Sequence, residues 1–549
     1  MLIPKLPHQL LAGMITGLLG SASVLAAPTL EFVKKWTYDA GSTPILDNYT
    51  NQGITDADLP AEAEIVVFDP LSERFFVVNG REQGVDVLDK GGAKIATLDT
   101  STTGAPNSVA VNKDGVVAIA VENGADKQSA GEIYFYDAAT AAKIGQLTAG
   151  ALPDMVTFTP DGKKVLVANE GEPSDDYTVD PEGTISIIDI SGGVASVTAA
   201  NVSTLGFDGF SKAAIEAEDG RIFGNGGSAT VAQDIEPEYI TVSPDGQTAF
   251  VTLQENNAVA KIDLTTNSIA DIQGLGFKDH SQAENSLDAS NRDGIDGNLQ
   301  TWPVLGMYQP DAIDSYVVGG QLYYVTANEG DARDYAGYSE EERVEDLVLD
   351  LDNDGNADTF SPLQDEDRLG RLKTTTAYGD TDSDGLFEQV YSYGARSFSI
   401  WDADGTQVYD SGNLIETLLA TQFPSNWEDG RSDDKGPEPE SITIAQIGDW
   451  FYALVGLERT SGLMVFDITD PTGPQFQSYI TALDDVSPEG LSFTLLGMFP
   501  DRPGGFGYVA VANEVSGTTT LYTVSAVPVP ASAALLALGL LTMRRLRHA

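Results

Sequence analysis

Two short acidic motifs in the middle of the chain could bind a divalent cation. The first reads DLDNDGNAD at residues 350–358, and the second reads DTDSDGLFE at residues 380–388. Each motif has acidic residues at positions 1, 3, 5 and 9 and glycine at position 6, so a tight loop can direct several oxygens at one hard cation, as calcium loops do. We expect calcium ligands at Asp350, Asp352, Asp354, Asp358, Asp380, Asp382, Asp384 and Glu388.

Both motifs lie in a long stretch, residues 330–393, with few signs of regular structure. Such a stretch is uncommon in a compact fold unless something organises it. Neither motif has the glutamate at position 12 of helix-flanked calcium loops, so both resemble the shorter loops of extracellular modules. The alternative is a pair of ordinary Asp-Gly turns, which are common in this chain. The repetition favours calcium, with a structural role.

A second set of acidic residues recurs at a fixed place in a repeated pattern. In each copy, an acidic or amide residue opens a strand of alternating apolar and polar residues, and two further strands end near Asn-Glu and at Asp. One copy reads PNSVAVNKDG, then VAIAVEN, then EIYFYDAAT. The residues that open the seven copies are Glu64, Asn107, Asp154, Glu238, Asp311, Glu440 and Glu489.

Alternation with period two, punctuated by Asp-Gly turns, is typical of antiparallel hairpins. A weaker fourth strand, such as KIGQL, completes each unit. The sequence therefore predicts an all-β fold, a seven-bladed β-propeller of four-stranded antiparallel blades at residues 27–526. The seventh copy lacks a fourth strand, and LEFVKKWTYD at residues 30–39 is free to supply it, so we expect the N-terminal strand to close the ring. Residues 330–393 then form an insertion in blade five.

In a propeller the first strand of each blade lines the central channel, so the opening residues are expected to meet at one mouth. Crowded carboxylates there would raise one another's pKa unless a cation neutralised them. One interpretation is a metal site. The other is a set of strand-end caps around a water-filled channel. The acidic members of this channel ring are Glu64, Asp154, Glu238, Asp311, Glu440 and Glu489.

An enzymatic interpretation uses the same mouth. Glu170 and Glu329 end second strands near the ring, and Arg333 and Arg396 belong to the fifth copy. Arginine binds phosphate in a bidentate way while metal ions activate water and offset charge. These four residues would then serve a calcium-dependent phosphoesterase, alkaline phosphatase-like or phytase-like. The competing interpretation is that each arginine pairs with a neighbouring carboxylate. A third alternative, an oxidoreductase with an organic cofactor in the channel, has no matching cofactor motif.

Longer strings carry a family resemblance. The strings VLVANEGEPSDDYTVDPEGTISIIDI, YYVTANEGDARDY, GARSFSIWDADG and SPEGLSF resemble the choice-of-anchor I family, exported propellers with varied C-terminal anchors, and the repeat resembles the YVTN type. The resemblance extends from about Leu30 to Ser525. It implies a propeller fold and a surface location, but no settled reaction, although some relatives carry alkaline phosphatase labels.

Both ends of the chain carry processing signals. Residues 1–26 have the basic start, apolar run and small-residue cleavage site of a signal peptide. Residues 527–549 begin VPVPA and continue through a short apolar run to terminal arginines, which resembles the PEP-CTERM sorting signal in its VPxPA variant. This resemblance implies exosortase-type sorting machinery as a partner and a transient anchor in the inner membrane, and the alternative is a plain tail anchor. Only this C-terminal segment is expected to contact the membrane.

The overall charge restricts the partners. The chain has 83 acidic and 30 basic residues, a formal charge of −53, and no cysteine. It cannot offer the basic face that nucleic acid requires, and thiol catalysis, disulfides and thiolate zinc sites are excluded. We therefore expect an exported, calcium-stabilised propeller at the cell surface or in the extracellular matrix. It would act as a binding or scaffold module for an unknown extracellular ligand or matrix component, with the phosphoesterase as the alternative.

Overall fold

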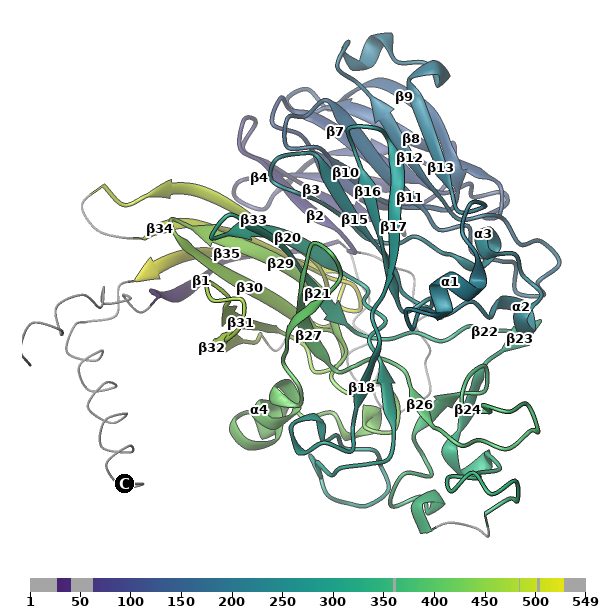
Figure 1. Ribbon diagram of the computed structural model, residues 1–549. Helices are drawn as coiled ribbons and strands as arrows, with labels where there is room; N and C mark the ends of the chain where they lie inside the picture. The colour runs from purple at the N-terminus through teal and green to yellow at the C-terminus, as the bar shows by residue number, and fades with distance from the viewer. Residues whose placement is uncertain (1–26, 41–62, 359–361, 483, 501–503, 528–549) are drawn as a thin grey trace, which may run out of the picture.

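The computed structural model describes residues 27–40, 63–358, 362–482, 484–500 and 504–527. Most of the regular structure in these ranges is β-strand, and Figure 1 shows the strands gathered in twisted sheets. The predicted signal peptide and the sorting segment after Val527 lie outside the described residues. The prediction of a mostly β fold built of four-stranded antiparallel sheets is confirmed.

Seven sheets in the described part of the chain have four strands each. Six use strands in chain order, and the seventh takes its outer strand from the N-terminus. The sheets are β2 (Val66–Asp69), β3 (Arg74–Asn79), β4 (Gly84–Asp89) and β5 (Lys94–Asp99); β6 (Pro106–Val111), β7 (Val116–Val121), β8 (Ala130–Asp137) and β9 (Ala142–Ala151); β10 (Pro153–Phe158), β11 (Lys164–Asn169), β12 (Thr184–Asp189) and β13 (Val202–Gly206); β14 (Ile240–Val242), β15 (Thr248–Leu253), β16 (Ala258–Asp263) and β17 (Ser268–Gly274); β20 (Ile313–Val318), β21 (Gln321–Asn328), β27 (Ser397–Asp402) and β28 (Gln407–Asp410); β29 (Pro439–Ile447), β30 (Trp450–Leu457), β31 (Leu463–Asp467) and β32 (Gln475–Ile480); and β33 (Pro488–Met498), β34 (Gly505–Asn513), β35 (Thr518–Val527) and β1 (Thr29–Asp39).

The core lies between neighbouring sheets. The second strand of a sheet, such as β3 or β7, is buried along almost its whole length because sheets cover both of its faces. Phe76 and Val78 of β3 share one cluster with Val117 and Ile119 of β7. Burying each such side chain contributes about 1.5–3 kcal/mol. Outer strands, such as β5, are largely exposed.

The first strands of successive sheets pack beside one another. Strand β2 packs beside β6, β6 beside β10, β10 beside β14, β14 beside β20, β20 beside β29, β29 beside β33, and β33 beside β2. This succession is the arrangement of a β-propeller, in which radial packing protects the sheet edges. Its consequence for function is that the starts of these strands are brought toward one axis.

A satellite unit with its own core lies beside the sheets, at the lower right of Figure 1. Residues 330–393 leave the fifth sheet after β21 and return before β27, and they pack against residues 277–307. Trp302 and Val304 share a cluster with Val344, Leu349 and Leu372. From the sequence, only residues 330–393 were expected in this region, and residues 277–307 were not. The short strands here are β18 (Phe277–Asp279), β19 (Leu305–Met307), β22 (Asp334–Tyr335), β23 (Tyr338–Ser339), β24 (Glu341–Arg343), β25 (Lys373–Thr375) and β26 (Tyr391–Ser392).

Two glycines form the neck of the insertion. Gly330 and Gly394 both have positive φ, 97° and 67°, which favours glycine. A Cβ on Gly330 would lie 2.1 Å from the Gly394 nitrogen, so the outgoing and returning chains approach too closely for a side chain. Glycine at both positions therefore lets the insertion leave and rejoin the sheet at one point.

Short helices connect some of the sheets. Three of them lie between β13 and β14. The last of these, the capped α3, carries Asp234, which forms an ion pair with the buried Arg333. The helices are α1 (Lys212–Glu216), α2 (Gly224–Gly227), α3 (Val231–Asp234) and α4 (Leu414–Gln422).

Strand β1 joins the two ends of the described chain. It pairs with β35 from Thr29 opposite Val527 to Asp39 opposite Thr518. Leu30 is 4% exposed and lies in a cluster with residues of the sixth and seventh sheets. The Tyr452 hydroxyl donates a hydrogen bond to the Pro28 carbonyl at 2.7 Å. The first strand after the predicted signal peptide is therefore part of the core.

Replacing Leu30 with alanine should lower the free energy of unfolding by about 2–4 kcal/mol, because a buried leucine is lost and a cavity remains. Val33 lies on the same strand but is 58% exposed, so Val33→Ala should change it by about 0.5 kcal/mol or less. Urea denaturation of both variants measures the difference. Equal effects would mean that β1 is not packed as described.

Candidate functional site

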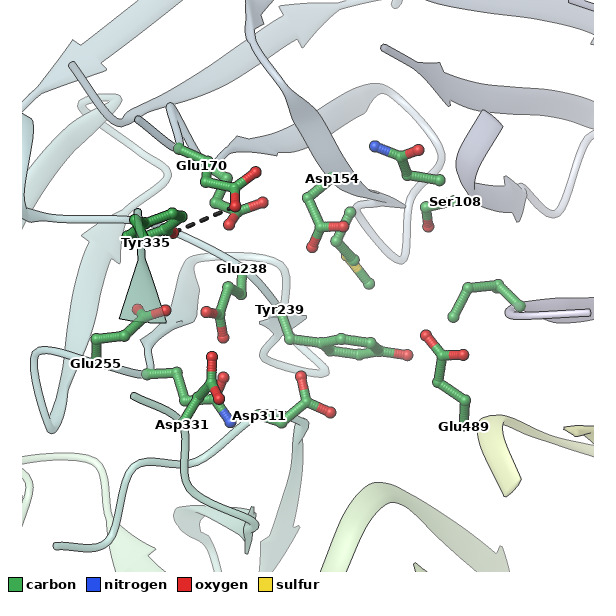
Figure 2. A pocket seen from close by; sticks show the side chains of 15 residues that line it. Ser108, Asp154, Glu170, Glu238, Tyr239, Glu255, Asp311, Asp331, Tyr335 and Glu489 are labelled. Carbon is green, nitrogen blue, oxygen red and sulfur yellow. Dashed lines mark hydrogen bonds between the residues drawn. The ribbon is translucent and has the colours of Figure 1, made fainter. Parts of the chain in front are cut away.

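An acidic cavity of about 280 Å³ lies where the first strands converge (Figure 2). Its walls come from the starts of first strands and from the turns that follow second strands. Asp154 is in β10, Glu238 lies just before β14, and Glu170 directly follows β11. The recurrence of an acidic residue at these places in the repeat therefore becomes a cluster in space.

Among the described residues, eight carboxyl groups and no lysine or arginine line this cavity. Four of these carboxyl groups belong to the predicted channel ring. The side chain of Asn107 also lines the cavity. The other two acidic members of the ring, Glu64 and Glu440, do not line the cavity. Burial raises the pKa values of both, and the charges of other ring members raise them further. The eight carboxyl groups belong to Asp154, Glu170, Glu172, Glu238, Glu255, Asp311, Asp331 and Glu489.

Burial and mutual repulsion disfavour the charged form of these acids. Burial, and then the charge of Glu172, raises the pKa of Asp154 to about 7. Burial likewise raises the pKa of Asp331 to about 7, although Lys435 opposes the effect. The pKa of Glu238 lies well above its usual value because of burial and then the charges of Glu255 and Asp311. Burial also raises the pKa values of Glu64, Glu170, Asp311, Glu440 and Glu489.

Several carboxylate oxygens at the mouth have no hydrogen-bond partner in the described part of the chain. The buried Oε2 atoms of Glu238 and Glu255 are unpartnered, and so are those of Glu440 and Glu489. The strand-end cap interpretation requires each carboxylate to accept backbone amides, and these atoms do not. Leaving a charged acceptor buried without a partner is costly. This part of the ring is therefore poorly explained as a set of caps.

On the opposite side of the mouth, the protein supplies its own cations. Glu329, Glu438 and Glu458 bring carboxylate oxygens within 4.8 Å of one another. Lys435 forms ion pairs with Glu329 and Glu438, and Arg459 lies 3.1 Å from both Glu438 and Glu458. Burial raises the pKa of Glu329 to about 7 against the effect of Lys435. Basic side chains thus occupy the place that a metal ion would take in this trio.

The two predicted catalytic arginines are committed elsewhere. Arg333 is 1% exposed and pairs with Asp234 at 2.9 Å and Glu236 at 3.0 Å. Arg396 pairs with Glu416 at 3.0 Å and donates to the backbone carbonyls of Asp288, Ser432 and Asp434. Neither guanidinium lines the acidic cavity. The interpretation of Arg333 and Arg396 as phosphate ligands is therefore replaced by buried ion pairs, and the phosphoesterase alternative gains no support.

The two predicted calcium loops have matching turns. Asp350 accepts hydrogen bonds from the amides of Asp354 at 3.1 Å and Gly355 at 2.8 Å. Asp380 accepts the equivalent bonds from Asp384 at 3.1 Å and Gly385 at 2.9 Å. The loops lie side by side, since a parallel bridge joins residues 349 and 387. The same residue pattern has therefore produced the same local fold twice.

Each loop gathers three carboxylates. Oxygens of Asp350, Asp352 and Asp354 lie within 4.8 Å of one another, and so do those of Asp380, Asp382 and Glu388. The remaining predicted ligands bond to loop amides: Asp358 accepts from Leu351 at 3.2 Å, and Asp384 accepts from Leu386 at 2.9 Å. Within the described ranges, no lysine or arginine forms an ion pair with any of these acids. The donor set fits calcium, which prefers several oxygen ligands.

Some cavity residues were not singled out from the sequence. Glu172 and Asp331 follow Glu170 and Glu329 by two residues, in the repeated string Asn-Glu-Gly-acid. That shared string in the third and fifth copies was the available signal. Tyr335 also lines the cavity, and its hydroxyl donates to Glu172 at 3.2 Å. Its position depends on the insertion, which the repeat pattern does not describe.

Comparisons with known proteins agree with the resemblance in the sequence. The family model described as "Choice-of-anchor I domain" matches residues 64–471. Gigasin-3a of Magallana gigas is 34% identical over 118 residues, 19% of this chain and 41% of that protein. The mesenchyme-specific cell surface glycoprotein of Strongylocentrotus purpuratus is 30% identical over 348 residues, 56% of this chain and 42% of that protein. The chain thus spans less than half the length of both relatives.

Solved structures give more distant likenesses. Hydrazine synthase of Kuenenia stuttgartiensis has 12% identity and a TM-score of 0.42, covering 86% of this chain and 97% of that one. The Cps50 (Swd1) β-propeller domain of Myceliophteria thermophila has 7% identity and a TM-score of 0.38, covering 86% and 98%.

The crowded acids predict a pH dependence of stability without calcium. Asp154, Glu329 and Asp331 have folded-state pKa values of about 7, against about 4 in an unfolded chain. Between these two pKa values each group binds more protons in the folded state than in the unfolded chain. The free energy of unfolding therefore falls as pH rises through about 7, by up to about 1.4 kcal/mol per group and pH unit. Chelator-treated protein should therefore melt at a lower temperature at about pH 8 than at about pH 6.

Asp154→Asn should reduce this slope because it removes one titrating group. Asp404→Asn is the matched control, since the Asp404 side chain is 87% exposed and lies away from the mouth. Melting temperatures across the pH series measure both variants. An unchanged slope in Asp154→Asn would show that Asp154 does not titrate in this range.

Proposed function

Because the chain belongs to the choice-of-anchor I family, we propose that it is an exported β-propeller that acts at the cell surface or in the extracellular matrix as a calcium-stabilised binding or scaffold module. A surface-associated propeller module fits the family and the fold. In this proposal the seven sheets are the blades of one ring, and β1 is the strand that closes it. The seven four-stranded sheets and the pairing of β1 with β35 support that architecture.

Delivery to the surface is the second part of the proposal. Residues 1–26 would direct export, and residues 527–549 would pass the protein to exosortase-type sorting machinery after a transient stay in the inner membrane. In the described ranges, no helix has the length and apolar character needed to cross a membrane. One relative carries "cell surface glycoprotein" in its name, which is consistent with an external location.

The matched loops are the observation that carries the calcium part of the proposal. Each holds three carboxylates close together, and like charges at such distances repel unless a cation lies between them. The charge of Asp354 already raises the pKa of Asp352. Calcium in both loops would remove this repulsion and brace the satellite unit, whose strands are only two or three residues long.

Removing calcium should lower the melting temperature and open residues 330–393 to protease. At free calcium about a hundredfold above Kd, each occupied loop contributes about 2.7 kcal/mol of stability. The variant Asp352→Asn/Asp382→Asn removes one ligand from each loop and should abolish the calcium-dependent shift. Differential scanning calorimetry and limited proteolysis, with and without chelator, measure both effects.

Asp404→Asn changes another Asp-Gly turn, outside the insertion, and should keep the full response to calcium. If the wild-type melt and digestion pattern were the same with and without calcium, the loops would not be calcium sites.

Deleting residues 528–549 should leave the described fold intact, because β35 ends at Val527. In the native host, the full chain should fractionate with the envelope or matrix, and the shortened chain should be released in soluble form. Immunoblots of the cell fractions measure the distribution. The same distribution for both forms would contradict sorting through this segment.

A further inference from the structure

The cavity mouth is neutralised on one side only. Near Glu329 and Glu438, Lys435 and Arg459 offset the negative charge. On the side formed by the third and fourth sheets, Glu170, Glu238 and Glu255 have no ion pair among the described residues. The buried Arg333 opposes the rise in the pKa of Glu255, but its ion pairs are with Asp234 and Glu236.

The unpaired side contains buried carboxyl groups that line the cavity. Glu238 is 9% exposed and Glu255 is 5% exposed, both line the cavity, and the Oε2 atom of each has no partner. Figure 2 shows their carboxyl groups, with those of Glu170 and Asp154, arriving from separate elements around one space. A buried carboxylate that remains charged needs a cation or several donors. Glu170, Glu238 and Glu255 form no ion pair with the described residues, so a cation from solution would supply the missing partner.

We propose that this side of the cavity binds a divalent metal cation that keeps part of its water shell, with Glu170, Glu238 and Glu255 as its principal carboxylates. Asp154 and Glu172 complete the negative wall. The site is separate from the calcium loops and goes beyond the proposed function, because each kind of site can bind its ion without the other.

The geometry explains why water is retained. Among the described residues, Glu170, Glu238 and Glu255 are not a trio whose carboxylate oxygens all lie within 4.8 Å of one another. A bare ion could not touch all three in this arrangement. The cavity volume of about 280 Å³ equals roughly nine water molecules at ~30 Å³ each. An ion with several of its waters fits this space, and magnesium and calcium both keep water in protein sites.

The test uses the full chain in a background where the loops no longer bind. In Asp352→Asn/Asp382→Asn protein, titration calorimetry with Ca²⁺, Mg²⁺ and Mn²⁺, each alone, should still show a binding event. Adding Glu238→Gln and Glu255→Gln should weaken that event at least tenfold. Glu182→Gln, at an exposed position, removes the same charge and should leave it unchanged. Circular dichroism checks that every variant is folded.

A luminescent probe locates the ion independently. Tyr239 lines the cavity, so its excitation should sensitise Tb³⁺ bound there. In the loop-variant background, Tyr239→Phe should reduce Tb³⁺ emission without changing its affinity, whereas Glu238→Gln should reduce both. The proposal is overturned if the loop-variant protein binds none of these metals, if the glutamine variants bind them as before, or if only an organic polyamine such as spermidine binds.

Discussion

The packing of each sheet's first strand against the first strand of the next sheet determines where the chemistry of this protein can lie. Because these strands surround one axis, whatever residue opens each of them is carried to the same place. In this chain that residue is acidic in six of seven copies, so the fold gathers negative charge that the sequence keeps far apart. Hydrophobic burial between sheets supplies the free energy that holds the acids together.

Basic side chains neutralise this concentrated negative charge on one side of the cavity mouth but not on the other. Near the sixth sheet, Lys435 and Arg459 neutralise the acids from within. Near the third and fourth sheets, the fully buried Arg333 forms its ion pairs with Asp234 and Glu236. The carboxyl groups of the cavity wall there repel one another and, among the described residues, have no ion pair that offsets this repulsion. The two halves of one mouth therefore differ in what they require from solution, although the same repeat builds both.

Much of the fold was accessible from the sequence because the relevant signals are local. Alternating residues and Asp-Gly turns are local, and repetition of the pattern made the sheets and the acidic ring predictable. The loops at residues 350–358 and 380–388 were found for the same reason. Pairing of Arg333 and Arg396 with carboxylates was the competing interpretation of the sequence, but the particular partners were not accessible, since they lie 99 and 20 residues away in the chain. The union of residues 277–307 with the insertion also depends on packing between distant segments, which no repeat encodes.

The pairing of β1 with β35 has a consequence for the order of assembly. Among the described strands, β1 is made first and its partner β35 is made last, so nearly the whole chain separates them. Long-range pairing of this kind is slow to form because a large loop must close first. During synthesis and export, Leu30 and the rest of β1 therefore wait without their partner until residues 518–527 have emerged. Until the two ends pair, one sheet edge of the newly made protein stays uncovered, and such edges are prone to wrong pairing. This is the stage at which help from the cell's folding factors would matter most.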